Sequence, residues 1–174
     1  MGLIKWGFRK WRLKRDPIKY WRKQGVSIGK DCEIYTSVQF GTEPYLITIG
    51  NHVRINAGVL FVTHDGGCWV IRGIKKECSD IDLFGNIVIG DNVHIGTNAI
   101  IMPNVKIGHN CIVGCGAIVT RDIPDNSIAV GVPARVIENI EEYYEKHKKD
   151  FVHTKNMTSK EKRLYLLDLQ KAKL

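Results

Sequence analysis

The sequence predicts an all-β solenoid, a parallel β-helix of short stacked strands, with helical segments at both ends. From Ile89 to Pro124 one six-residue pattern repeats six times without a break, as IGDNVH, IGTNAI, IMPNVK, IGHNCI, VGCGAI and VTRDIP. Each hexad opens with an aliphatic residue, and a small or apolar residue follows four positions later. A period of six matches neither the face of an amphipathic helix nor the alternation of a half-buried strand.

If three hexads close one coil, the opening residues of successive coils stack as Ile89 over Ile107, Ile95 over Val113 and Ile101 over Val119. Stacked strands lie ~4.8 Å apart, and these aliphatic ladders would fill the interior. Glycine and asparagine recur between the opening residues, and both tolerate positive φ. We therefore expect corners at Gly90, Gly96, Gly108, Gly114, Asn92, Asn98, Asn104 and Asn110.

Residues 1–24 predict a basic helical cap over the first coil, because a solenoid needs its open end covered. Asp16 and Pro17 suit the N-cap and first position of a helix, and Gly25 suits its end. The segment carries nine Lys and Arg against one acid, interleaved with aromatic residues. That composition also suits an anionic membrane surface, and we do not expect nucleic acid as a partner.

Residues 25–136 form the predicted solenoid. The phase starts at Ile28 and Ile34, breaks over 41–46 and resumes at Ile49. It vanishes over 62–86, which predicts an excursion loop of the kind in which function concentrates. Residues 137–174 predict a helix over 138–149 and a second helix after a capping box from Thr158 to Glu161. We expect the apolar face of that last helix to pack on the solenoid or on a neighbouring subunit; its residues are Leu164, Leu166, Leu167 and Leu169.

The composition is that of one globular domain of 174 residues with a net charge of +8. No stretch approaches 18 apolar residues and no signal-peptide pattern is evident, so we expect a cytoplasmic protein, peripheral at the inner membrane surface if residues 1–24 bind it. The five cysteines lack CxxC spacing, which favours a reduced setting and gives no zinc signature.

The excursion begins VTHDGGCWVIR, which places His64 at the rim of the solenoid. His52, His94 and His109 occupy outward positions of the repeats, whereas His147 and His153 lie in the polar C-terminal region. A zinc hydratase would need three converging ligands, and no pair of these histidines is spaced to face each other.

The hexads, the THDGG loop and the run IVGCGAIVTRDIPDNSIAVGVPARVI resemble the hexapeptide-repeat acetyltransferases, in particular the bacterial sugar O-acetyltransferases and those of capsular polysaccharide. The resemblance covers residues 26–140. It implies a left-handed β-helix, a homotrimer, and acetyl-CoA bound in a groove between adjacent subunits, with no metal. The chain departs from the maltose and galactoside enzymes in lacking their helical N-terminal acceptor motif.

His64 matches the catalytic histidine of that family, and a general base is what a weakly nucleophilic sugar hydroxyl requires. The group that orients it stays open between Asp65, a backbone carbonyl and a loop carboxylate such as Glu77, Asp80 or Asp82. By motif position, the residues implied to bind acetyl-CoA are Asn56, Thr97, Cys115, Thr120, Arg121 and Arg135. Candidate acceptor residues are Trp69, Arg72 and Tyr35, with Glu43 and Tyr45 near the same rim.

The acceptor predicted in this way is a saccharide or a lipid-linked saccharide. Alternatives are N-acetylation of an amino sugar nucleotide, and O-acetylation of serine or an antibiotic. A non-catalytic scaffold and a zinc hydratase are the readings from other functional classes.

Overall fold

The computed structural model describes residues 13 and 15–172. Most of the basic segment, and with it the predicted membrane contact, lies outside the described residues. The chain forms two compact units, Met1–Glu142 and Tyr143–Leu174. The first extends past residue 136, where the sequence placed the end of the solenoid, because the strand Arg135–Asn139 still pairs with it.

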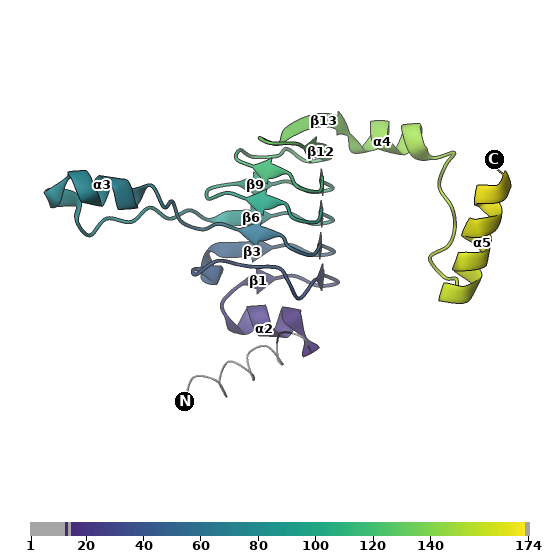
Figure 1. The fold of residues 1–174 in the computed structure, drawn as a ribbon, viewed down its shortest axis with the longest axis horizontal. Helices are drawn as coiled ribbons and strands as arrows, with labels where there is room; N and C mark the ends of the chain where they lie inside the picture. Colours follow the sequence, from purple (N-terminus) through teal and green to yellow (C-terminus); the bar gives the residue numbers. More distant parts are fainter. Residues whose placement is uncertain (1–12, 14, 173–174) are drawn as a thin grey trace. The chain divides into compact units, whose positions relative to one another are not determined.

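The first unit is built from three sheets that the chain visits in turn (Figure 1). Sheet A contains β1 (Ser27–Ile28), β3 (Ile47–Ile49), β6 (Ile87–Ile89) and β9 (Lys106–Ile107). Sheet B contains β2 (Glu33–Ile34), β4 (Arg54–Ile55), β7 (His94–Ile95), β10 (Ile112–Val113), β12 (Ser127–Val130) and β13 (Arg135–Asn139). Sheet C contains β5 (Leu60–Phe61), β8 (Ile100–Ile101) and β11 (Ile118–Val119). All strand pairs are parallel except β12 with β13, so each round of the chain adds one coil to the stack.

The register of the strands confirms the predicted stacking. The paired residues are Ile89 with Ile107, Ile95 with Val113, and Ile101 with Val119. These aliphatic side chains are at most 1% exposed and form one continuous core. Burying each contributes about 1.5–3 kcal/mol relative to exposure, which is how two-residue strands become stable.

The corners confirm the prediction for asparagine and correct it for glycine. Asn92, Asn98 and Asn104 have φ of 56°, 58° and 61°. The glycines that follow the opening residues have no positive φ. They are required for another reason: a Cβ on Gly90 would lie 2.8 Å from the carbonyl carbon of Gly108. These glycines let one coil lie close against the next.

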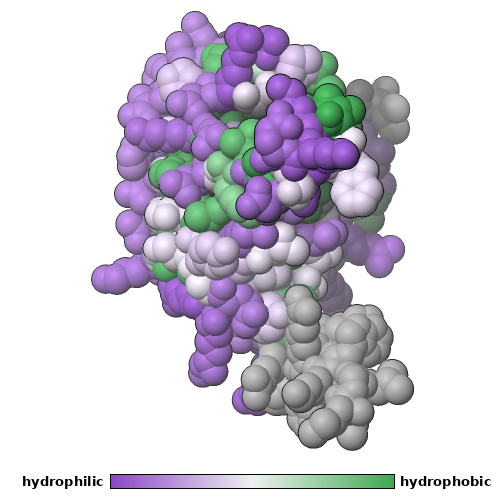
Figure 2. All heavy atoms as spheres, turned by 90° about the vertical axis from the view of Figure 1, so that its left-hand side faces the viewer, coloured by the Kyte–Doolittle hydropathy of each residue, from purple (hydrophilic) through white to green (hydrophobic). Residues whose placement is uncertain are grey.

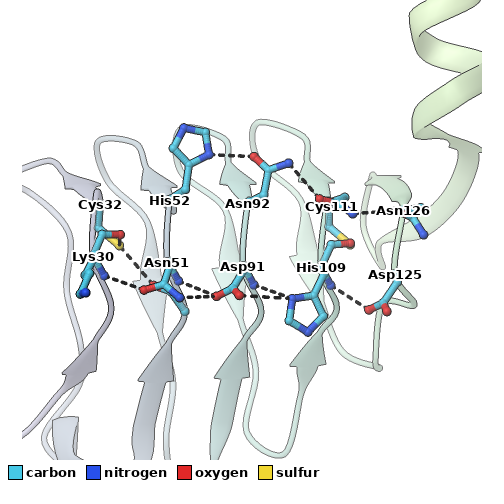
Figure 3. Close-up of polar contacts among 12 residues, drawn as sticks. Lys30, Cys32, Asn51, His52, Asp91, Asn92, His109, Cys111, Asp125 and Asn126 are labelled. Atoms are coloured by element: carbon cyan, nitrogen blue, oxygen red, sulfur yellow. Dashed lines mark hydrogen bonds and ion pairs between the residues drawn. The ribbon is translucent and has the colours of Figure 1, made fainter.

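Two lines of side chains run along the corner between sheets A and B (Figure 3). In one, His52 Nδ1 lies 2.8 Å from Asn92 Oδ1, and the Asn92 amide donates to Asn110 at 2.9 Å. The Asn110 amide then donates to Asn126 at 2.9 Å. In the other, side chains receive backbone N–H groups of the preceding coil; these acceptors are Asn51, Asp91, His109 and Asp125.

The helix α2 (Pro17–Lys23) covers the first coil, as expected for a cap. Asp16 is its N-cap and accepts the Lys19 N–H at 2.8 Å. Trp21 is buried, with its ring 4.7 Å from that of Phe40. Aromatic packing therefore closes the core at this end.

At the other end of the stack β13 pairs antiparallel with β12 and is followed by α4 (Ile140–His147), which crosses into the second unit. The second unit contains α5 (Ser159–Ala172). Its predicted capping box is confirmed, since Glu161 accepts the Thr158 N–H at 2.7 Å and Thr158 Oγ1 accepts the Glu161 N–H at 3.3 Å. No described helix is long and apolar enough to cross a membrane.

Candidate active site

The two interruptions of the repeat leave the stack at the same corner, where the chain passes from sheet C to sheet A. The first, residues 41–46, ends in the 3-10 turn η1 (Pro44–Leu46) and leads into β3. The second, residues 62–86, carries α3 (Cys68–Ile74) and η2 (Lys76–Cys78) and leads into β6. Because Gln39 bridges to Leu60 and Ile47 pairs with Ile87, the two interruptions belong to adjacent coils.

The excursion leaves the stack through a short antiparallel stem that carries His64. His64 bridges to Phe84, the Asp65 N–H donates to Leu83 O at 2.8 Å, and the Gly85 N–H donates to Thr63 O at 2.8 Å. The imidazole is 46% exposed. Backbone pairing thus holds His64 at the rim of the stack while its ring stays accessible.

Glu43, from the first interruption, is the carboxylate that contacts His64. Its Oε2 lies 3.1 Å from His64 Nδ1 and accepts the hydroxyl of buried Thr63 at 2.7 Å. Thr42 Oγ1 lies 3.5 Å from the same ring nitrogen. The sequence predicts Glu43 near the acceptor rim and does not predict its contact with His64.

Two of the carboxylates considered for this role from the sequence, Asp65 and Asp82, have other contacts. Asp65 accepts the Gly67 N–H at 2.7 Å, two residues along its own turn. Asp82 lies 3.4 Å from the Arg72 guanidinium. A signal for Glu43 was present in the sequence, because the phase break over 41–46 comes one coil before the break over 62–86.

Hydrogen bonds from Thr42 and Thr63, followed by the hydrogen bond and charge of His64, lower the pKa of Glu43 despite the opposing effect of burial. The carboxylate is therefore ionised at neutral pH and can only accept hydrogen bonds. In the neutral imidazole, the nitrogen that faces this carboxylate, Nδ1, carries the hydrogen, and the lone pair then lies on Nε2. This is the tautomer in which the exposed ring edge can take a proton.

Three of the residues expected at acetyl-CoA lie together at the corner between sheets B and C. Asn56 follows β4, Thr97 follows β7 and Cys115 follows β10, and the Gly116 N–H donates to Thr97 O at 2.8 Å. Cys115 is exposed, and a Cβ on Gly116 would meet nothing within 4 Å. Asn56 Oδ1 is buried without a hydrogen-bond partner among the described residues. This corner thus presents open backbone and an acceptor that lacks a donor.

Of the other three, Thr120 and Arg121 lie at the opposite edge of sheet C, whereas Arg135 lies at the corner between sheets B and C, because it opens β13 of sheet B and pairs with Val130. Thr120 and Arg121 follow β11 at the corner from which the excursion departs, two coils beyond it and so about 10 Å along the stack. Arg135 begins β13, directly after the Ala134 N–H that donates to Ile118 O at 2.8 Å. The predicted residues therefore flank sheet C, whose outward side chains are half-buried aliphatics; these are Leu60, Ile100 and Ile118.

The candidate acceptor residues divide between two places. Trp69 and Arg72 share α3, which projects from the stack (Figure 1), and Trp69 is 78% exposed. Figure 2 views this side of the molecule, where green apolar atoms lie among purple polar ones. Tyr35 lies elsewhere, after β2 at the corner between sheets B and C, where the Arg54 guanidinium donates to its hydroxyl at 3.2 Å. Within one chain, Tyr35 therefore does not join His64.

The outward histidines are held by different neighbours. His52 and His109 belong to the corner lines described above, and burial together with the charge of Arg54 lowers the pKa of His94. Within residues 13 and 15–172, no group of three or more His, Cys, Asp or Glu is arranged to hold a metal ion.

Comparison with known proteins finds relatives of the repeats and of most of the chain. A family model for the bacterial transferase hexapeptide (six repeats) matches residues 86–121. Protein CapG of Staphylococcus aureus is 49% identical over 150 residues, which cover 84% of this chain and 85% of CapG. The galactoside O-acetyltransferase of Escherichia coli (strain K12) is 43% identical over 99 residues, covering 56% of this chain and 46% of that enzyme.

Among solved structures, a hexapeptide-repeat-containing acetyltransferase from Vibrio cholerae O1 biovar eltor, complexed with acetyl-CoA, superposes with a TM-score of 0.60. The match covers 76% of this chain and 84% of that one at 24% identity, and it shows likeness of fold.

Proposed function

Because this chain belongs to the bacterial hexapeptide-repeat acetyltransferases, we propose that it transfers an acetyl group from acetyl-CoA to a hydroxyl of a sugar or polysaccharide precursor, with His64 as general base. It is an acetyl-CoA-dependent O-acetyltransferase. The observation that carries the role of His64 is its hydrogen bond to Glu43, which leaves Nε2 able to accept a proton.

The reaction needs one proton to move twice. His64 Nε2 takes the proton of the acceptor hydroxyl as the hydroxyl oxygen attacks the thioester carbonyl carbon. A new C–O bond forms, the C–S bond breaks, and the imidazolium returns the proton to the departing thiolate. A backbone N–H at the rim stabilises the oxyanion, a contribution on the order of 10²–10³ in rate.

The residues flanking sheet C fit acetyl-CoA. The acceptor oxygen of Asn56 has no donor among the described residues and suits an amide N–H of the pantetheine arm. Thr97 and Cys115 stand at an open corner where a chain can approach the backbone. Arg121 and Arg135 are exposed guanidinium groups suited to phosphate oxygens, and Thr120 precedes Arg121 directly.

The acceptor belongs to the same proposal. Exposed Trp69 and the neighbouring Arg72 offer an aromatic face and a donor, which suit a saccharide or a lipid-linked saccharide. The name of the galactoside O-acetyltransferase supports a sugar acceptor. Left-handed coils and a homotrimer are part of the same proposal and rest on membership of the hexapeptide-repeat family. The proposed location of the enzyme is the cytoplasm, with residues 1–24 bound to the inner membrane surface.

The test compares His64→Ala with wild type, measuring thiol release from acetyl-CoA with a panel of sugars. Loss of the general base should lower kcat by about 10²–10⁴-fold. His153→Ala, an exposed histidine of the second unit, should match wild type. Equal activity of His64→Ala and wild type would sink the assignment of His64.

Mass spectrometry of the product separates the remaining alternatives. We expect an ester on a saccharide hydroxyl from a mixed pool of saccharides, amino sugar nucleotides and serine. Acetylation confined to an amine would replace the present proposal with an N-acetyltransferase.

A further inference from the structure

We infer that Glu43 is a positioning residue, which fixes His64 as the Nδ1–H tautomer through a carboxylate anchored by Thr63. The inference rests on the proposed function for its kinetic consequence. The hydrogen bond between the Glu43 and His64 side chains does not depend on that function. Glu43 itself touches no substrate in this scheme and acts only through His64.

The anchoring begins in the core. Thr63 is fully buried, directly after the coil that ends at Phe61, and its hydroxyl donates to Glu43 Oε2 at 2.7 Å. A buried hydroxyl requires a partner, because burial removes it from water and an unsatisfied one is destabilising. Thr63 therefore holds the carboxylate in place against the rigid end of β5.

The orientation of His64 follows from where that carboxylate stands. The oxygen that accepts Thr63 also faces His64 Nδ1 at 3.1 Å, and Glu43 is only 16% exposed. A carboxylate offers no proton to the ring, so this contact selects the tautomer with hydrogen on Nδ1. The opposite tautomer would present an N–H at Nε2 and could not take the proton of an acceptor hydroxyl.

An ordinary surface ion pair would not have this consequence. Exposed ion pairs contribute little, because water screens the two charges and both side chains remain mobile. Glu43 differs because one oxygen joins a buried threonine to the ring, and because the interruption that supplies Glu43 lies one coil below the stem that supplies His64. On the other arm of the stem Phe84 contacts the ring at 6.5 Å between centroids and supplies no competing charge.

The experiment uses full-length wild type, Glu43→Leu, which removes the acceptor, and Glu43→Gln, which keeps a neutral one. Glu141→Leu makes the same change at an exposed glutamate of α4, away from the rim, and should behave as wild type. Two-bond ¹H–¹⁵N spectra of protein labelled with ¹⁵N-histidine report the tautomer of His64. The His64 signals are assigned by their absence from the spectrum of His64→Gln. Steady-state kinetics report kcat and the KM for acetyl-CoA.

We expect wild type to show the Nδ1–H tautomer and Glu43→Leu to gain the Nε2–H tautomer. The kcat of Glu43→Leu should fall by about 10–10²-fold, and its KM for acetyl-CoA should stay within about 3-fold of the wild-type value. A His64 ring with its proton on Nε2 cannot act as general base, so part of the rate enhancement from general base catalysis is lost. Glu43→Gln should recover part of the loss. An unchanged Nδ1–H tautomer in Glu43→Leu would overturn the inference.

The tautomer measurement also separates this inference from the proposed function. If wild type transfers no acetyl group to any acceptor, the proposed function fails, and the spectra still decide whether Glu43 orients His64. If Glu43→Leu changes the tautomer without lowering the kcat of an active enzyme, the positioning role is refuted and acetyl transfer stands.

Discussion

At the residue scale, the corners use glycine and asparagine for different physical reasons. Asparagine takes the left-handed conformation, as at Asn92 with φ of 56°. The glycine two residues earlier, Gly90, takes no positive φ and instead gives room to the next coil. The hexad therefore carries one constraint on backbone conformation and a separate constraint on contact between coils.

Replacing Gly90 with alanine should destabilise the first unit. The new Cβ would lie 2.8 Å from backbone atoms of Gly108, and overpacking of this kind costs about 1–3 kcal/mol. Gly66→Ala is the matched control, because a Cβ there meets nothing within 4 Å and should change stability by less than about 0.5 kcal/mol. Urea unfolding followed by circular dichroism measures both. Equal midpoints for the two variants would contradict the close-approach explanation.

At the scale of elements, the corner between sheets A and B links successive coils by side chains as well as by strands. The amides of Asn92 and Asn110 each donate to the next asparagine at 2.9 Å, so the bonds run in one direction along the stack (Figure 3). The parallel line of acceptors includes His109, whose Nδ1 accepts the Asp91 N–H at 3.0 Å. Each coil is thereby held in register at a point where no strand pairs.

Two substitutions of Asn110 should separate the bonding of this corner from its conformation. Asn110→Gly keeps the φ of 55° accessible and removes two side-chain hydrogen bonds, each worth about 0.5–1.5 kcal/mol. Asn110→Ala removes the same bonds and adds a left-handed penalty of about 1–2 kcal/mol. We expect the free energy of unfolding to be largest for wild type, smaller for Asn110→Gly and smallest for Asn110→Ala. If alanine proves as stable as glycine, the conformational share of the argument is wrong.

At the scale of the whole molecule, the two compact units divide the hydrophobic core unevenly. Every residue of the continuous core lies before Glu142. In the second unit, Leu164, Leu166 and Leu167 are exposed. The stability of the stack therefore resides in the first unit.

Truncation after Glu142 should leave the melting temperature of the first unit within a few degrees of that of the full chain. Truncation after Ala134 is the contrasting variant, because it removes β13 and exposes the edge of β12. That shorter protein should melt earlier. Differential scanning calorimetry of the three proteins decides, and a large loss on removing residues 143–174 alone would show that the second unit supports the stack.

Much of this fold was predictable because its rule is local. The hexad places one aliphatic residue in the core of each strand, and the stacking follows from counting, as Ile95 over Val113 shows. The capping box at Thr158 and the N-cap at Asp16 were predictable for the same reason, since each depends on neighbours within one turn. The role of the corner glycines was not, because contact between coils has no signature in a single hexad.

By itself, the sequence determined the period, the stacked parallel sheets and the place of His64 at a break in the repeat. Periodicity is a one-dimensional property, and a repeat that buries two residues in each hexad, as at Ile95 and Ala99, leaves the chain few other ways to fold. Only the tertiary structure decided which group faces His64. Glu43 and His64 are 21 positions apart in the chain and meet because both interruptions leave the same corner in adjacent coils. Their contact depends on register between coils, and register is set by the packing of the whole stack.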